Sequence, residues 1–519
     1  MDSQSSLLGA KTWSLEKRRP SARARAEKQE GAVQVIDAED PATEPPSPPP
    51  EDIDWSAVAL PFVFPAIGGA LFGYDIGATS GAVISLKDAA LSGTTWFDLS
   101  PLATGLVVSG SLGGALLGSI LAYLIADPIG RRKELLSAAA LYLIGALLMA
   151  FAPSLPALVA GRVAYGLGIG LAMHGAPMYI AETAPSKVRG TLISLKEAFI
   201  VGGILLGYLG GYFEIGEVGG WRWMYGLSAP AAVLMAAGML WLPESPRWLL
   251  LRACDDKGDP SQLKGEARTC LKRLRGARAS DEQADEQVAG ILDALNADKG
   301  EDLGADAWKE LLTGPNIKAL TIGTGLVFFQ QVTGQPSVLY YAATIFKDAG
   351  FAEASEATKI SVFLGSLKLA ATMLSVVVVD KAGRRPLLLA GVSGICASLL
   401  ALAAYYSSGQ SVPIASVVAL LVYVGCYQIS FGPISWLMVS EIFPLRVRGR
   451  ALSLATLVNF GSNALVSFAL PTVQEDLGQA GTFFTFFVIA LASLAFIYFQ
   501  VPETKGLSLE EIEEQLSKS

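Results

Sequence analysis

The sequence predicts an all-α membrane protein whose twelve transmembrane helices form two similar six-helix bundles. Of its 519 residues, 52% are hydrophobic and 17% are charged, and the mean hydropathy is +0.44. This apolar excess is too large for a soluble chain of this length. Between Trp55 and Val501, we place twelve mostly apolar runs of about 20 residues, the length of a membrane span. The runs are 56–84, 101–126, 134–152, 155–180, 190–213, 221–242, 317–346, 359–379, 386–408, 412–440, 449–471 and 481–501.

The two halves of the chain repeat. Glu182 and Arg189 return as Glu441 and Arg448, both at a shift of 259 residues. A duplicated six-helix unit explains the match, and in such transporters the substrate site lies between the halves near the midplane. We therefore divide the chain into an N-terminal tail (1–54), a first bundle (55–242), a helical loop (243–316), a second bundle (317–501) and a C-terminal tail (502–519).

Basic residues gather in alternate loops, which sets the orientation. Clusters follow spans two, four, eight and ten, whereas the opposite loops carry only scattered basic residues. By the positive-inside rule, both termini and the long middle loop face the cytoplasmic side. The tail lacks an apolar run, so no secretory signal is expected there. Its Ser-, Ala- and Arg-bearing start resembles the later part of an organelle transit peptide, and a basic cytoplasmic tail is the alternative.

Asp75 interrupts an apolar run that otherwise reads as a membrane span. A carboxyl inside the hydrocarbon is costly unless it faces a wet cavity or has a partner. The other deep charge of the first half is Arg162. We expect Asp75 to line a central cavity, to exchange a proton and to pair with Arg162. A static ion pair that only holds two helices together is the alternative.

Acids and arginines recur at span ends on the cytoplasmic side of both halves. Charge-assisted pairs between them would hold the cytoplasmic ends of the halves together in one conformation and break in the other. We therefore predict a gating network. Its members are Asp127, Arg131, Glu182, Arg189, Asp380, Arg384, Glu441 and Arg448.

Several strings together resemble the sugar porter branch of the major facilitator superfamily, over residues 55–515. They are Asp-x-x-Gly-Arg-Arg twice, Gly161-Arg162, the Glu-to-Arg-Gly repeats, Pro-Glu-Ser-Pro-Arg-Trp, Gln330-Gln331, Gly432-Pro433 before Trp436, and Pro-Glu-Thr-Lys-Gly. The resemblance implies the major facilitator fold and alternating access around a bound sugar. Together with the transit-like tail, it favours the plastid envelope, with the vacuolar or plasma membrane as alternatives.

By position in the family's motifs, the resemblance also implies a set of sugar contacts. Amides offer a donor and an acceptor to sugar hydroxyls, and an indole offers a flat apolar face. An acid at Asp75 is likewise typical of the proton-coupled members. The implied sugar contacts are Gln330, Gln331, Trp436, Asn459, Asn463 and Glu197.

Two positions depart from the family's pattern. Lys196-Glu197 stands where the family commonly has Asn-Gln, so a carboxyl occupies a sugar-contact position with Lys196 as its neighbour. Pro336 replaces an asparagine that other members use for sugar. The only histidine, His174, reads as a hydrogen-bonded helix-end residue, with a proton relay as the alternative.

The sequence thus predicts proton-coupled symport of a monosaccharide, hexose or pentose. An uncoupled sugar facilitator is one alternative, and a non-transporting sugar sensor is another. Partners are the sugar, the proton and the bilayer; we expect a monomer and no nucleic acid. An enzyme is not expected, because no nucleophile–base set, metal-ligand cluster or phosphate loop accompanies the spans, and no cofactor is predicted.

Overall fold

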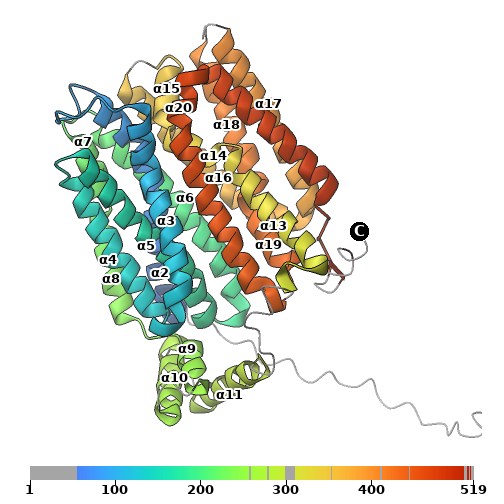
Figure 1. Ribbon diagram of the computed structural model, residues 1–519. Helices are drawn as coiled ribbons and strands as arrows, with labels where there is room; N and C mark the ends of the chain where they lie inside the picture. The colour runs from blue at the N-terminus through green and yellow to red at the C-terminus, as the bar shows by residue number, and fades with distance from the viewer. Residues whose placement is uncertain are drawn as a thin grey trace, which may run out of the picture. The chain divides into compact units, whose positions relative to one another are not determined.

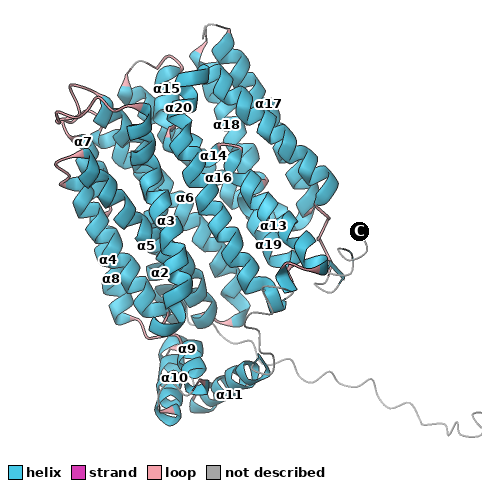
Figure 2. Ribbon diagram, viewed as in Figure 1, coloured by secondary structure: helices cyan, strands magenta, loops and turns pink. Residues whose placement is uncertain are grey.

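The computed structural model describes residues 55–255, 259–276, 280–298, 310–351, 353–408, 412–443, 445–507, 511, 512 and 515. Within these ranges every regular element is a helix (Figure 2). The predicted tail, 1–54, lies outside them. Asp54–Ser519 form one compact unit. The bundle boundaries placed at 242 and 317 stay a prediction.

The first half contains six membrane helices, the last of which is made of two pieces. Pro61 and Pro65 lie inside the first helix, and Pro177 lies inside the fourth. Such prolines are tolerated in membrane helices because neighbouring helices satisfy the released backbone groups. The elements are α2 (Trp55–Lys87), α3 (Pro101–Ile129), α4 (Arg131–Ala150), α5 (Leu155–Thr183), α6 (Ser186–Glu214), α7 (Gly220–Gly226) and α8 (Ala229–Trp241).

Three shorter helices follow the first half and lie at the end of the bundle where α2 begins (Figure 1). A small apolar cluster around Trp248 and Leu250 holds them together. They are α9 (Pro246–Cys254), α10 (Pro260–Arg275) and α11 (Asp281–Asp298).

The membrane helices of the second half have more interruptions than those of the first. Its first membrane helix is interrupted at Gly334, whose φ of 91° favours glycine. Its fourth is interrupted at Ser430. The elements are α13 (Gly314–Val332), α14 (Gln335–Tyr340), α15 (Ala342–Asp348), α16 (Ala354–Ala382), α17 (Arg384–Ser407), α18 (Pro413–Ile429), α19 (Phe431–Ile442) and α20 (Leu445–Gln500).

The long helix α20 holds two spans. Gly478, with φ 67° and ψ 176°, breaks the helical geometry inside it. Both ends of α20 lie near Arg384, because that residue bonds Glu441, just before α20, and Glu503, just after it. The chain therefore reverses direction at Gly478.

Ten helical segments of the described chain are long and apolar enough to cross a membrane. The second span of α20 adds one, and the broken series α13–α15 adds another. The total is the predicted twelve. The protein is thus a multi-pass membrane protein with the expected all-α fold.

The halves meet mainly where α3 packs on α20 and α6 on α16, and also where α2 contacts α14 and α15. Among the described residues, two hydrogen bonds cross between them. Ser80 on α2 accepts from the backbone N–H of Ala343 at 3.0 Å, and the hydroxyl of Tyr208 on α6 donates to the carbonyl of Leu339 at 2.8 Å. Ser80 lies near the end of α2 at Lys87, far from the end where α2 begins. The halves are therefore joined on the side opposite α9–α11.

Candidate functional site

Asp75 on α2 and Arg162 on α5 form a buried ion pair. The Nη1 group of Arg162 donates to Oδ1 of Asp75, and the side chains are 0% and 1% exposed. The predicted partners therefore meet. However, the carboxyl was expected to line a wet cavity, and in this conformation it is enclosed by protein.

Ser111 on α3 completes this site and was not predicted. Its hydroxyl donates to Oδ2 of Asp75 at 2.8 Å and accepts from Nη2 of Arg162 at 2.8 Å. Helix α3 reaches this position because Gly166 on α5 has no side chain: a Cβ there would overlap the carbonyl of Ser111. Small residues allow this close approach between membrane helices.

The rest of the Arg162 guanidinium is also satisfied. Its Nε donates to the carbonyl of Val107 at 2.8 Å, its Nη2 donates to the carbonyl of Val108 at 3.0 Å, and it lies over the ring of Tyr225 at 5.3 Å. Only the bond to Asp75 involves an opposite charge. Protonation of Asp75 would thus remove the counter-ion of Arg162 and leave its neutral partners in place.

The two adjacent glutamines lie just before the break between α13 and α14. The Nε2 of Gln330 donates to the carbonyl of Phe431 at 2.8 Å, where α18 ends and α19 begins. Gln330 and Gln331 are buried, yet the Oε1 atom of each lacks a hydrogen-bond partner within the described residues. A buried polar atom without a partner costs about 1–3 kcal/mol. Two such acceptors on consecutive residues suit a ligand rich in hydroxyl donors.

More polar atoms lack a partner within the described residues, on residues that follow these glutamines in the chain or precede Trp436. They include Nε2 of Gln335 and the hydroxyls of Tyr340 and Ser435. Gln335 precedes Pro336, so an amide is available beside the residue that departs from the family's pattern.

The other predicted sugar contacts are partly assembled. Trp436 on α19 is half-buried. It lies one turn after Gly432, whose carbonyl accepts a hydrogen bond from Nε2 of Gln330. Asn459 and Asn463 are one turn apart on α20; the first is half-buried and the second is buried. Asn463 accepts a hydrogen bond from Ser467 at 3.2 Å. Helices α13, α19 and α20 pack on one another, which groups these side chains within the second half.

Glu197 is the one predicted sugar contact that belongs to the first half. It lies on α6, its side chain is 55% exposed, and Oε1 is 3.3 Å from Nζ of Lys196. The neighbour suggested by the sequence is therefore its ion-pair partner.

Lys368 is a buried charge that sequence reasoning missed. It lies on α16, is 5% exposed, and donates from Nζ to Oε1 of Gln428 at 2.6 Å. The sequence does mark it, because Lys368 is the only charged residue of the apolar run between Ile360 and Val379.

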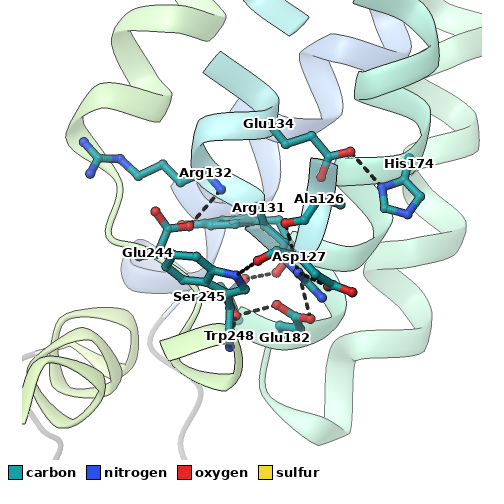
Figure 3. A network of polar contacts seen from close by, with 12 residues as sticks. Ala126, Asp127, Arg131, Arg132, Glu134, His174, Glu182, Glu244, Ser245 and Trp248 are labelled. Carbon is teal, nitrogen blue, oxygen red and sulfur yellow. Dashed lines mark hydrogen bonds and ion pairs between the residues drawn. The ribbon is translucent and has the colours of Figure 1, made fainter. Parts of the chain in front are cut away.

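The cytoplasmic network of the first half is built around Arg131 (Figure 3). Arg131 bonds Asp127 at 2.8 Å and Glu182 at 3.2 Å. Ser245 donates to Glu182 at 2.5 Å, and the indole of Trp248 donates to the carbonyl of Asp127 at 2.7 Å. These bonds join α3, α4 and α5 to α9.

The second half repeats the pattern. Arg384 bonds Glu441 at 2.8 Å, and the hydroxyl of Thr504 donates to Glu441 at 2.6 Å. Glu503 accepts the backbone N–H groups of Arg384 and Arg385 at 3.0 Å, as Glu244 accepts that of Arg132 at 2.9 Å in the first half. Each carboxylate thus lies at a helix N-terminus, where negative charge is favoured.

Two members of the predicted network differ from expectation, and a third is not described. Arg189 is exposed and does not reach Glu182, whose bonds go to Arg131 and Ser245. Arg448 donates to the backbone carbonyl of Phe443 at 3.0 Å instead of a carboxylate. The side chain of Asp380 lies outside the described part. The bonds of each network also stay within one half, because in this conformation the halves meet at their opposite ends.

His174 contacts Glu134, an acid that the sequence analysis did not single out. Its Nδ1 lies 2.7 Å from Oε1 of Glu134, a buried residue near the start of α4 (Figure 3). The contact joins α4 to α5. His174 is thus hydrogen-bonded as expected, but it lies nine residues before the end of α5 and not at a helix end.

Outside the membrane, burial acts differently on the two capping glutamates. Burial raises the pKa of Glu244 above its usual range, although the N–H of Arg132 offsets part of the rise. Burial also raises the pKa of Glu503, but four backbone N–H groups, that of Lys505 foremost, outweigh it and hold the pKa below its usual range.

Comparison with known proteins places this geometry in a family. The family model described as sugar (and other) transporter matches residues 62–516. The D-xylose-proton symporter-like 3, chloroplastic, of Arabidopsis thaliana is 59% identical over 469 residues, covering 90% of this chain and 84% of that protein. The D-xylose transporter of Levilactobacillus brevis is 36% identical over 458 residues, covering 88% of this chain and 95% of its own.

Solved structures of sugar transporters also match this chain. The xylose transporter XylE from E. coli, in a partially occluded inward-open conformation, matches with a TM-score of 0.73 and 28% identity, covering 87% of this chain and 100% of that one. A second structure is described as the proton:xylose symporter XylE bound to 6-bromo-6-deoxy-D-glucose. It matches with a TM-score of 0.70 and 29% identity, covering 89% of this chain and 99% of that one. The resemblance drawn from the motifs is confirmed, and the chain belongs to the sugar (and other) transporter family.

Proposed function

We propose that the protein is a proton-coupled symporter that moves a monosaccharide, hexose or pentose, by alternating access. The observation that carries the proposal is the buried Asp75–Arg162–Ser111 cluster, in a chain that also holds unpartnered glutamine acceptors. An ionisable group buried in a membrane helix is a functional residue by default. The named relatives, D-xylose-proton symporter-like 3 and XylE, support the same assignment.

Asp75 is the proposed proton site. Deprotonated, it holds Arg162 through Oδ1 and accepts from Ser111 through Oδ2. Protonated, it is neutral and no longer holds the guanidinium by charge. The contacts that α2 and α5 make with each other then weaken, which favours movement of α2 against α14 and α15 of the second half.

Gln330, Gln331, Trp436, Asn459, Asn463 and Glu197 are the proposed sugar contacts. Sugar hydroxyls would satisfy Oε1 of both glutamines. Coupling requires that sugar and proton each bind one conformation more tightly than the other, because only a difference in affinity shifts an equilibrium.

The cytoplasmic charge networks are the proposed gate. In the present conformation the side chain of Asp127 is 72% exposed, and its carboxylate binds Arg131 alone among the described residues. The halves are joined on the opposite side through Ser80 and Tyr208. This arrangement supports an inward-facing state, in which the cytoplasmic ends of the halves have separated.

We further propose a plastid envelope location, as in the chloroplastic relative, with a vacuolar or plasma membrane as the alternatives. The protein acts as a monomer in the bilayer, without a nucleic-acid partner and without enzymatic activity.

Sugar-induced alkalinisation tests the proposal. Purified full-length protein is reconstituted in proteoliposomes that contain a pH-sensitive dye, and D-xylose or D-glucose is added without a pH gradient. Symport predicts proton movement with the sugar. Sugar uptake that is indifferent to a pH gradient would instead establish a facilitator, and the absence of uptake for a panel of hexoses and pentoses would favour the sensor.

A further inference from the structure

Lys368 lies at the centre of a membrane helix. It is 14 residues from either end of α16, Ala354–Ala382. With a rise of 1.5 Å per residue, its Cα is about 21 Å from each end. A cation at this depth costs several kcal/mol unless the protein or a ligand compensates it.

The ammonium group is linked to the proposed sugar site. Besides its bond to Gln428, it lies 5.6 Å from the ring centre of Tyr427. The hydroxyl of Tyr427 donates to the carbonyl of Gln330 at 3.3 Å. The side chain of Tyr427 thus lies between the ammonium of Lys368 and the backbone of Gln330, a proposed sugar contact.

The charges around this site do not cancel. Asp75 and Arg162 neutralise each other, and so do Lys196 and Glu197. Among the described residues, no carboxylate lies within the ion-pair distance of 4.0 Å from Nζ of Lys368. Glu197 is already paired with Lys196. When both lysines are protonated, two lysines and one glutamate leave one positive charge.

We propose that Lys368 is a specificity-determining residue that binds the carboxylate of an acidic monosaccharide, a hexuronate, in the sugar site. This inference rests on the proposed function and narrows its substrate class. One ammonium matches the single charge of a carboxylate. A sugar phosphate carries about −1.5 to −2 and needs more cations, whereas Arg162 and Lys196, which are also buried in membrane helices, are held by Asp75 and Glu197.

The series D-xylose, D-glucose and D-glucuronate tests the charge directly. The three sugars share ring and hydroxyl configuration and differ only at C5, which carries a hydrogen, a CH2OH or a carboxylate. Titration calorimetry on the purified full-length protein gives their affinities, and D-glucose 6-phosphate serves as the phosphate probe. We expect D-glucuronate to bind at least tenfold more tightly than D-xylose.

Substitutions separate ligand binding from a structural role. In Lys368→Met, the ratio of glucuronate to xylose affinity should fall at least tenfold, and Lys368→Arg should restore most of it. In Glu197→Gln the same ratio should rise, because removal of a competing carboxylate leaves Lys368 more available. If Lys368 and Glu197 instead formed a latch between the halves, both substitutions would move the ratio in the same direction or not at all.

Each outcome decides between the two proposals. If xylose or glucose binds and glucuronate does not, the inference about Lys368 is wrong while the proposed function stands. Tighter binding of glucose 6-phosphate than of glucuronate also overturns it, as does a ratio unmoved by Lys368→Met. If none of the four ligands binds, the proposed function and this inference fail together.

Discussion

The hydroxyl of Ser245 donates a hydrogen bond to Glu182 at 2.5 Å. Residues shifted by 259, Thr504 and Glu441, make the same bond at 2.6 Å. Serine and threonine are interchangeable here because only the hydroxyl is used. The duplication visible in the sequence therefore extends to individual hydrogen bonds, each tying the segment after the sixth span of a half to its fourth span.

Replacement of Asp75 by asparagine should abolish concentrative uptake but leave sugar counterflow. The amide keeps the size of the carboxyl but cannot cycle a proton. It also leaves Arg162 without a counter-ion, a change that costs about 3–5 kcal/mol in buried pairs, so a lower melting temperature is expected. Uptake against a gradient and counterflow are both measured in proteoliposomes.

The matched control is Asp98→Asn, because Asp98 is an exposed acid in the loop between α2 and α3. It should transport like the unmodified protein. Accumulation of sugar by the Asp75→Asn protein would refute the assignment of the proton site.

Gln331→Ala should weaken sugar binding several-fold without a loss of stability. A net hydrogen bond is worth about 0.5–1.5 kcal/mol, which corresponds to roughly two- to tenfold in affinity. Because Oε1 of Gln331 has no described protein partner, its removal leaves no protein group unpaired. Gln330→Ala should weaken binding and also destabilise the protein, since the carbonyl of Phe431 loses its donor.

Gln262→Ala on the exposed face of α10 is the control for both variants. Affinity is measured by calorimetry and stability by thermal denaturation in detergent. An unchanged affinity in both glutamine variants would remove them from the sugar site.

Gly114→Ala and its neighbour Gly113→Ala should differ sharply. A Cβ at Gly114 would overlap the carbonyl of Val163 on α5, whereas a Cβ at Gly113 would meet nothing within 4 Å. Overpacking costs about 1–3 kcal/mol, and alanine favours a helix over glycine by roughly 1 kcal/mol. Gly114→Ala should therefore lower the melting temperature and the transport rate, while Gly113→Ala keeps or raises the melting temperature. Equal melting temperatures would argue against the close contact of α3 with α5.

Glu503→Gln should destabilise the protein more at pH 7 than Glu244→Gln. The ionised Glu503 accepts four backbone N–H groups, and a glutamine has only one carbonyl oxygen to offer them. Glu244 has a raised pKa and accepts the N–H of Arg132 through one oxygen, which a glutamine reproduces. Melting temperatures of the two variants at pH 7 give the comparison.

The pH dependence follows from the sign of each pKa shift. Because the folded-state pKa of Glu503 is depressed, its stabilising contribution is present above its ordinary pKa of 4.5 and is lost as the pH falls below that value. Because the pKa of Glu244 is raised, its contribution is present below 4.5 and is lost as the pH rises through the raised value. Glu503→Gln should therefore flatten the decline of stability on acidification. A larger loss at pH 7 in Glu244→Gln would contradict this assignment.

The sequence by itself determined the twelve spans, their duplication and the two deep charges. Each follows from local properties: the length of apolar runs, the recurrence of motifs at one offset, and the cost of Asp75 and Arg162 in hydrocarbon. The family could be recognised for the same reason, since its motifs are short strings.

The tertiary structure decided which side chains meet. Ser111 enters the ion pair because glycines on α3 and α5 let the helices approach, and Lys368 reaches Gln428 because α16 packs on α18. Arg189, although repeated in sequence, is exposed, and Glu182 bonds Arg131 instead. A helical pattern fixes the face on which a residue lies, but the rotation and spacing of packed helices fix its partner, and these depend on every contact in the bundle at once.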